Sequence, residues 1–207
     1  EGTMGMSQSK LSTYARCPYF YKLLYVDGAK FPKTTPLLIG TVAHKVMENC
    51  GNLLPQRMDI RQIYSDAAKS IINELGLGLT KQQYAEIYYP VISMLDTFYA
   101  NYPVNKPMAV EQKFILPYKN LTMTGVFDII DRSAGELYIL DYKTGRFMGS
   151  DWLSLLSSFQ TVIYHWAAET IYGGSFVVKY WWLKWNERRT LNITPEIRAK
   201  TFRKISN

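Results

Sequence analysis

The sequence has little cysteine, little histidine and no long apolar run. Two cysteines, Cys17 and Cys50, and two histidines occur among 207 residues. So few thiols exclude a disulfide-rich secreted scaffold and favour a reducing, cytoplasmic compartment. No stretch approaches the roughly 18 apolar residues of a membrane span, and the polar start lacks the apolar segment of a signal peptide. We therefore expect a cytoplasmic protein that does not span a membrane.

Charged residues are also few, at 20%, but they are unevenly placed. The whole chain carries 24 basic and 17 acidic residues, a net charge of +7. From Gly174 to the end, eight basic residues accompany two acidic ones, so this segment alone carries +6. Such an asymmetry indicates a polyanionic partner, either nucleic acid or an acidic membrane surface. A solvated basic helix that only keeps the protein soluble explains the same charge equally well.

The first half of the chain has helical patterns. Its length predicts one domain, residues 1–207, in which residues 1–5 read as a cloning remnant and 7–105 as a mainly helical portion. Ser7 or Ser9 suits the N-cap of a first helix, which Pro18 breaks near Arg16 and Cys17. The other expected segments are a loop at 27–39, near-helical spacing at 40–54, and helices at 59–75 and 81–102, the last kinked or interrupted at Pro90.

The second half, residues 106–207, changes its period. Short segments rich in β-branched and aromatic residues at 108–116, 121–130 and 136–141 predict an antiparallel three-stranded meander. A helix at 152–172, strands at 176–185 and 190–194, and a final helix from Pro195 complete the prediction. This order predicts an α/β or α+β fold with a mixed central sheet flanked by helices.

An acid and a base stand together where the strand at 136–141 ends. In "ELYILDYKTG", Asp141 and Lys143 are two residues apart and so share a strand face. A tight turn brings the preceding strand, with Asp128, alongside, so the three side chains can converge. The same acid-x-lysine pattern occurs at Glu111, but the nearest acid before it, Asp96, falls within a predicted helix. Glu111 on the first strand can lie near the site, but its neighbour Phe114 favours an ordinary role in the sheet.

Two neighbouring carboxylates and a lysine have a chemical use. The carboxylates repel each other unless a cation lies between them, and Mg²⁺ or Mn²⁺ prefers such hard oxygen ligands. A bound ion polarises a phosphoryl oxygen and lowers the pKa of a bound water, while the lysine can stabilise the transition-state charge. The alternative is a surface salt bridge between Asp141 and Lys143, worth little energetically.

Five segments in chain order resemble the PD-(D/E)XK nuclease superfamily, specifically its RecB-type exonuclease branch. They are "SQSKLSTYARCPYFYKLLYV", "GTVAHKVME", "GVFDII", "ILDYKTG" and "FQTVIYHWA". The resemblance implies a restriction-endonuclease-like core and a Mg²⁺ or Mn²⁺ cofactor. It also implies metal ligands at His44, Asp128 and Asp141. The implied catalytic residues are Asp128, Asp141 and the lysine Lys143, with Gln160 and Tyr164 orienting the substrate and the lysine.

The residues alone support these added roles less strongly. A lone histidine on an apolar helix face, such as His44, is more often a core residue than a ligand. Gln160 and Tyr164 are four residues apart and share a helix face, but packing explains the tyrosine equally well. Some RecB-type nucleases hold an iron–sulfur cluster with four cysteines, the first of which would fall on Cys17. No cysteine follows Cys50, so we expect no cluster and interpret Cys17 as a small buried side chain.

The resemblance implies a metal-dependent deoxyribonuclease of a bacterial or phage-infected cell. We expect an exonuclease that acts on DNA ends in recombination, repair or phage DNA metabolism, with DNA rather than a membrane as partner. The resemblance also allows a helicase or a recombination protein as a further partner. A structure-specific endonuclease and a catalytically idle DNA-binding module remain the alternatives. The expected DNA contacts are Lys179, Lys184, Arg188 and Arg189, interleaved with Trp181, Trp182 and Trp185, which either stack on unpaired bases or form half of a buried strand.

Overall fold

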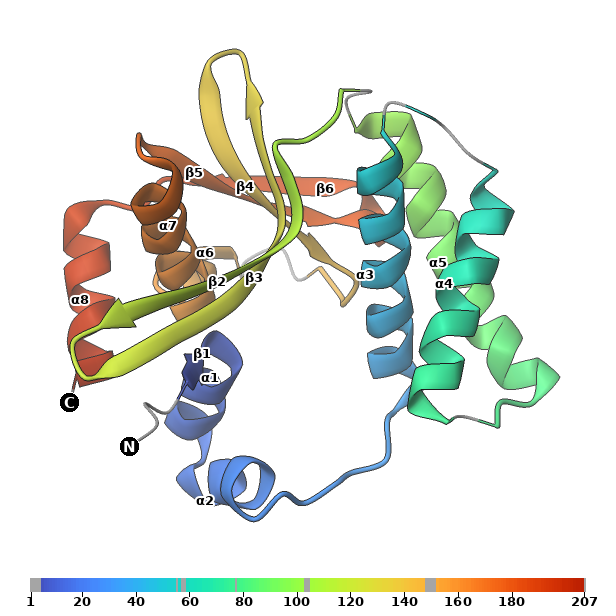
Figure 1. The fold of residues 1–207 in the computed structure, drawn as a ribbon, viewed down its shortest axis with the longest axis horizontal. Helices are drawn as coiled ribbons and strands as arrows, with labels where there is room; N and C mark the ends of the chain where they lie inside the picture. The colour runs from blue at the N-terminus through green and yellow to red at the C-terminus, as the bar shows by residue number, and fades with distance from the viewer. Residues whose placement is uncertain are drawn as a thin grey trace.

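The computed structural model describes residues 5–54, 56, 59–76, 78–102, 105–147 and 152–206. A mixed six-stranded sheet lies between two groups of helices (Figure 1). Strands β2 (Ala109–Tyr118), β3 (Leu121–Ser133) and β4 (Glu136–Lys143) form the predicted antiparallel meander. Strand β5 (Phe176–Trp182) runs parallel to β4, and β6 (Glu187–Leu191) pairs antiparallel with β5. The predicted mixed sheet is therefore confirmed.

The start of the chain differs from the prediction in two ways. Strand β1 (Gly5–Ser7) pairs in parallel with β3, so Gly5 belongs to the fold, whereas the rest of the supposed cloning remnant lies outside the described residues. Ser7 caps helix α1 (Gln8–Arg16), and the predicted break falls at Cys17. Cys17 is only half-buried, and its Sγ accepts a hydrogen bond from the Phe20 amide as the N-cap of α2 (Pro18–Tyr21). The interpretation of Cys17 as a buried side chain was wrong.

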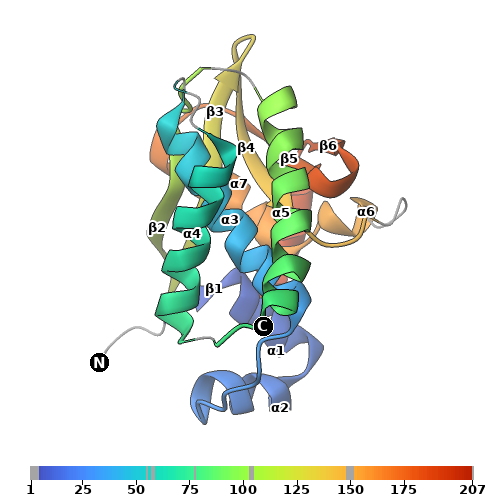
Figure 2. The same ribbon diagram turned by 90° about the vertical axis from the view of Figure 1, so that its right-hand side faces the viewer.

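Three helices pack on one face of the sheet (Figure 2): α3 (Thr35–Leu53), α4 (Ile60–Leu75) and α5 (Lys81–Asn101). Helix α3 begins inside the segment predicted as a loop, because Pro36 fits a first helical turn, where its missing amide hydrogen is not needed. Helix α5 continues through Pro90 and is not interrupted there. A short π-helix, Lys22–Val26, precedes the connection to α3.

The other face is covered by α1, α7 (Phe159–Tyr172) and α8 (Pro195–Ser206). The predicted helix at 152–172 is two helices, α6 (Trp152–Leu155) and α7, because the Ser158 side chain caps a new start by accepting a hydrogen bond from the Thr161 amide. The predicted strand at 176–185 ends at Trp182, and residues Leu183–Trp185 form a 3₁₀ turn, η2. Among the described residues, none of the helices is long and apolar enough to cross a membrane.

Two hydrophobic cores result, one on each face of the sheet. Ile129 packs with α3, α4 and α5, while its neighbour Ile130 packs with α7 and α8, as strand alternation requires. Strand β5 alternates in the same way, with Trp181 in the first core and Trp182 in the second. The ends of β3 and β4 therefore lie where helices from both faces can reach them.

Candidate active site

Asp128 and Asp141 lie side by side where β3 and β4 separate. The last recorded pair of the two strands is Ile129 with Leu140, so the next step of the register puts Asp128 opposite Asp141. Beyond this pair, a side chain of β3 accepts a hydrogen bond from the backbone of β4: the Tyr142 amide donates to Asp128 Oδ2 at 2.8 Å. Both carboxylates are buried, with exposed fractions of 7% and 3%. The structure thus places two buried acids together at the point the sequence indicated.

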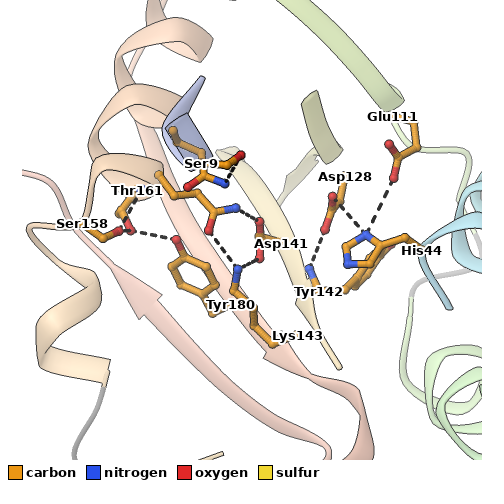
Figure 3. A network of polar contacts seen from close by, with 12 residues as sticks. Ser9, His44, Glu111, Asp128, Asp141, Tyr142, Lys143, Ser158, Thr161 and Tyr180 are labelled. Carbon is orange, nitrogen blue, oxygen red and sulfur yellow. Dashed lines mark hydrogen bonds and ion pairs between the residues drawn. The ribbon is translucent and has the colours of Figure 1, made fainter. Parts of the chain in front are cut away.

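Lys143 is tied to Asp141 and to helix α7 (Figure 3). Its Nζ lies 2.6 Å from Asp141 Oδ2 and donates to Gln160 Oε1 at 2.9 Å. Gln160 Nε2 in turn donates to Asp141 Oδ1 at 2.5 Å, which closes a triangle of three side chains. The Lys143 ammonium also lies 4.9 Å from the centre of the Tyr180 ring. This arrangement holds the lysine in one orientation beside the acids.

Tyr164 lies one helical turn beyond Gln160 but is mostly a packing residue. It is 7% exposed and makes edge contacts with the rings of Phe114 and Phe127. Burial raises the pKa of its hydroxyl, which hydrogen-bonds to the Val126 backbone and the Gln160 side chain. Tyr164 therefore helps to fix the Gln160 side chain through a hydrogen bond, and a direct contact of Tyr164 with substrate stays a prediction.

His44 reaches the same strand ends from α3, on the opposite face from α7. Its Nδ1 lies 3.5 Å from Asp128 Oδ1 and 4.0 Å from Glu111 Oε1. Ligand atoms of His44, Glu111 and Asp128 all lie within 4.8 Å of one another, so the three could share one ion. Asp141 is not in this group, since both its oxygens face Lys143 and Gln160.

Glu111 joins the candidate ligand group, although the sequence favoured an ordinary role in the sheet. It lies between two recorded pairs of the β2–β3 ladder, at the position opposite Asp128. Counting back across the short turn between the two strands would have found it, because an antiparallel register continues once the turn is known. The comparison of Glu111 with Asp96, an acid that precedes it in the chain, did not reveal its neighbour, because the acid beside Glu111 is the one opposite it on β3, Asp128.

Both strands leave regular geometry at this level. Glu111 has a φ of 47°, in the left-handed region that side chains other than glycine rarely adopt. On β3, Phe127 and Ile130 both pack in the core with α7 although they are three residues apart, so strand alternation changes around Asp128. Backbone strain of this kind costs roughly 1–3 kcal/mol and clusters at functional sites. Here the strain aims the Glu111 carboxylate at His44 and Asp128.

The charges in the site perturb one another. Burial lowers the pKa of His44, but the carboxylates of Asp128, Asp141 and Glu111 outweigh burial and raise this pKa to about 9. Burial, with the charge of Asp128, raises the pKa of Glu111 to about 7. Burial also raises the pKa of Asp141, although Lys143 opposes the rise. The pKa of His44 is raised by three carboxylates despite burial, which shows that negative charge is concentrated around this side chain.

The donor set fits a divalent cation. Carboxylate oxygens suit Mg²⁺ and Mn²⁺, and an imidazole shifts the preference toward Mn²⁺. A cation at this position would offset both the burial and the charge of Asp128 that raise the pKa of Glu111. The residues present therefore fit such an ion, with His44, Glu111 and Asp128 as the nearest donors and Asp141 beside them.

The basic residues predicted to contact DNA fall into two kinds. Lys179 and Arg189 form ion pairs with Glu136 and Glu187, respectively, so their charges are largely compensated. Arg188 lies 4.0 Å from the centre of the Trp181 ring and donates to a backbone carbonyl, that of Asn101. The fourth residue, Lys184, is exposed.

Comparison with known proteins agrees with this geometry. The family model of the PD-(D/E)XK nuclease superfamily matches residues 5–204. The chain belongs to this superfamily, and it is therefore a nuclease whose fold is the restriction-endonuclease-like one that the sequence predicted. No protein with a curated description matches the chain.

Solved structures share the fold at low identity. A protein from Eubacterium rectale, described as a candidate exonuclease, aligns with a TM-score of 0.63 and 11% identity over 96% of this chain and 76% of its own. The structure of SSO0001 aligns at 14% identity over 100% of this chain and 75% of its own. Its TM-score of 0.44 is too low to carry an argument.

Proposed function

We propose that this nuclease is a metal-dependent deoxyribonuclease of the RecB type that hydrolyses phosphodiester bonds from DNA ends. The observation that carries the proposal is that two groups lie side by side, because the strand register puts Asp128 opposite Asp141: the candidate ligands around Asp128, and Lys143 held by Asp141 and Gln160. The five motifs in RecB-type order support the branch, and a structural neighbour described as a candidate exonuclease supports the action on ends. Recombination, repair or phage DNA metabolism in the cytoplasm of a bacterium or phage-infected cell would supply such ends, with a helicase or recombination protein as a further partner.

The residues divide the chemistry between them. His44, Glu111 and Asp128 would hold a Mg²⁺ or Mn²⁺ ion, with Asp141 beside them as a further oxygen donor. A bound divalent ion supplies Lewis acidity to a phosphoryl oxygen and lowers the pKa of a bound water. Lys143 stabilises the negative charge that develops on the scissile phosphate. Gln160 keeps the lysine in place through its hydrogen bond, so it acts as a positioning residue.

The test compares linear and closed-circular DNA, single- and double-stranded, with Mg²⁺, Mn²⁺ or EDTA. We expect metal-dependent loss of linear DNA, about 10²–10⁴-fold slower in Lys143→Ala, because the variant lacks the charge that stabilises the transition state. Lys69→Ala, which removes an exposed lysine of α4, is the matched control and should cut normally. Cutting in EDTA, or full activity of Lys143→Ala, would refute the mechanism.

The same experiment separates the alternatives. Cleavage of closed circles would replace the exonuclease by a structure-specific endonuclease. Binding of DNA without cleavage under any metal condition would leave a DNA-binding module. The intact set of Asp128, Asp141 and Lys143, held together by short contacts, favours the enzyme over that module.

A further inference from the structure

A cleft of about 470 Å³ adjoins the candidate active site along α3. It is lined by residues of α3, α5, the segment after β4 and the η2 turn: Pro36, Ile39, Pro90, Met94, Thr144 and Trp185, with Gly145, Arg146 and Lys184. Thr144 directly follows Lys143, and a Cβ atom at Gly40 would lie 3.3 Å from Thr144 Oγ1. Gly40 is one helical turn, about 6 Å, before His44. The cleft therefore begins next to Lys143 and lies beside the part of α3 that is one turn from His44.

The cleft holds the exposed member of three nearby tryptophans. Trp181 and Trp182 are 0% and 7% exposed and belong to the two cores. Trp185 is 43% exposed, and Lys184 Nζ lies 5.1 Å from the centre of its ring. The core does not require an indole at this exposed position, because η2 already anchors its buried side with Leu183. A half-exposed aromatic ring in a cleft, with a cation beside it, suits a planar ligand group that carries negative charge.

Two cations in the cleft lack acidic partners within the part of the chain that the structure describes. Arg146 and Lys184 are both exposed, and neither forms an ion pair with a described acid. Two other basic residues of the C-terminal segment are paired, Lys179 with Glu136 and Arg198 with Glu169, whereas Lys200, Arg203 and Lys204 are exposed on α8. Arg146 and Lys184 thus place uncompensated positive charge beside the exposed tryptophan, where it would attract phosphate groups.

We propose that this cleft binds an unpaired nucleotide of the DNA strand that enters the active site. The base stacks on Trp185, and Arg146 and Lys184 contact the phosphates on either side of it. In a duplex both faces of a base are covered by its neighbours, so stacking on Trp185 requires a strand that is already single or has frayed. The proposal rests on the proposed nuclease function and names its substrate class: single-stranded DNA, or duplex DNA with a single-stranded end.

The test measures binding without catalysis. Fluorescence anisotropy in EDTA gives the affinity for a fluorescein-labelled oligothymidylate and for a labelled duplex minicircle, which has neither ends nor unpaired loops. We expect Trp185→Ala to weaken binding of the single strand about tenfold, the size of one lost base–aromatic stack, and to change duplex binding less than twofold. Trp185→Tyr keeps an aromatic face and should restore most of the affinity. Combined Arg146→Ala and Lys184→Ala should reduce the slope of log affinity against log salt for the single strand.

Controls make every outcome decisive. Tyr19→Ala removes an aromatic side chain that is 68% exposed on α2, and it should leave both affinities unchanged. Circular dichroism checks that Trp185→Ala is folded. If Trp185→Ala is unfolded, the affinities of Trp185→Tyr and Trp185→Leu are compared instead, because leucine keeps an apolar side chain but has no aromatic face. No binding of the single strand by the unaltered protein, or an equal loss for strand and duplex, overturns the proposal. DNA cutting by the unaltered protein is scored separately, so failure of the cleft and failure of the nuclease function give different results.

Discussion

At Glu111 one residue combines an uncommon backbone conformation with a place in the ligand group. Its φ is 47°, and its carboxylate lies 4.0 Å from His44 Nδ1. Burial raises the pKa of this carboxyl to about 7, so without a cation it is partly protonated near neutral pH. The positive φ and the buried carboxyl of Glu111 both reduce the stability of the fold, while the carboxylate completes the ligand group.

Two substitutions at this residue separate strain from charge. Glu111→Ala and Glu111→Gly both remove the carboxylate, but only glycine adopts a positive φ without steric cost. We expect the glycine variant to be more stable than the alanine variant by about 1 kcal/mol in urea unfolding with EDTA. Both variants should bind Mn²⁺ more weakly than the unaltered protein in calorimetric titrations. Equal stability of the two variants would show that the backbone at this position is unstrained.

At the scale of elements, Gly125 sets how closely α7 approaches the sheet. A Cβ atom there would clash with the Phe114 ring and lie 3.0 Å from Tyr164 Cε1. Because both rings are packed in the core, we expect Gly125→Ala to destabilise the fold by roughly 1–3 kcal/mol in urea unfolding. Gly78→Ala is the matched control, since nothing lies within 4 Å of its added Cβ and its φ is not positive. A neutral Gly125→Ala would mean that α7 can move away from β3 at no cost.

The contact between α7 and α8 makes stability depend on pH through His165. This side chain is 3% exposed, its Nδ1 accepts a hydrogen bond from Arg198 Nη2 at 2.9 Å, and Glu169 lies 3.6 Å away. Burial and Arg198 lower the pKa of His165 below its ordinary 6.5, although Glu169 and the Phe176 backbone oppose this. The unfolded chain therefore binds a proton near pH 6.5 that the folded protein does not, and stability falls as the pH drops below that value.

The measurement compares the unaltered protein with His165→Gln. Urea unfolding from about pH 7.5 to about pH 5.5 should show a larger loss of stability in the unaltered protein, because the glutamine cannot take up a proton. The difference between the two proteins cancels the contributions of His44 and of the carboxyl groups. Parallel stability curves would contradict a neutral His165 in the folded state.

At the scale of the whole molecule, the ligand group connects the two cores. His44 comes from α3, in one core, while β2 and β3 also pack against α7, in the other. An ion bound by this group binds the folded chain only, because the unfolded chain does not bring these residues together. At a concentration 100 times its dissociation constant, such an ion adds about 2.7 kcal/mol, or roughly 5–10 °C in Tm for a chain of this size.

We expect Mn²⁺ and Mg²⁺ to raise Tm in scanning calorimetry, and Asp128→Asn to lose most of this shift. The asparagine keeps the shape of the side chain and an oxygen for the Tyr142 amide, but it lacks the charge that attracts the ion. Lys143→Ala, which leaves the ligand group intact, should keep the shift. An equal shift in Asp128→Asn would place the ion elsewhere.

The sequence by itself determined the features that depend on neighbours in the chain. Strand alternation put Asp141 and Lys143 on one face, and a short turn placed Asp128 opposite them, because these relations follow from local backbone geometry. Only the tertiary structure decided that Glu111 joins His44, that Lys179 is compensated by Glu136, and that Trp185 is exposed while Trp181 and Trp182 are buried. Those outcomes depend on how helices from both faces meet one end of the sheet, and local periodicity contains no information about packing between distant segments.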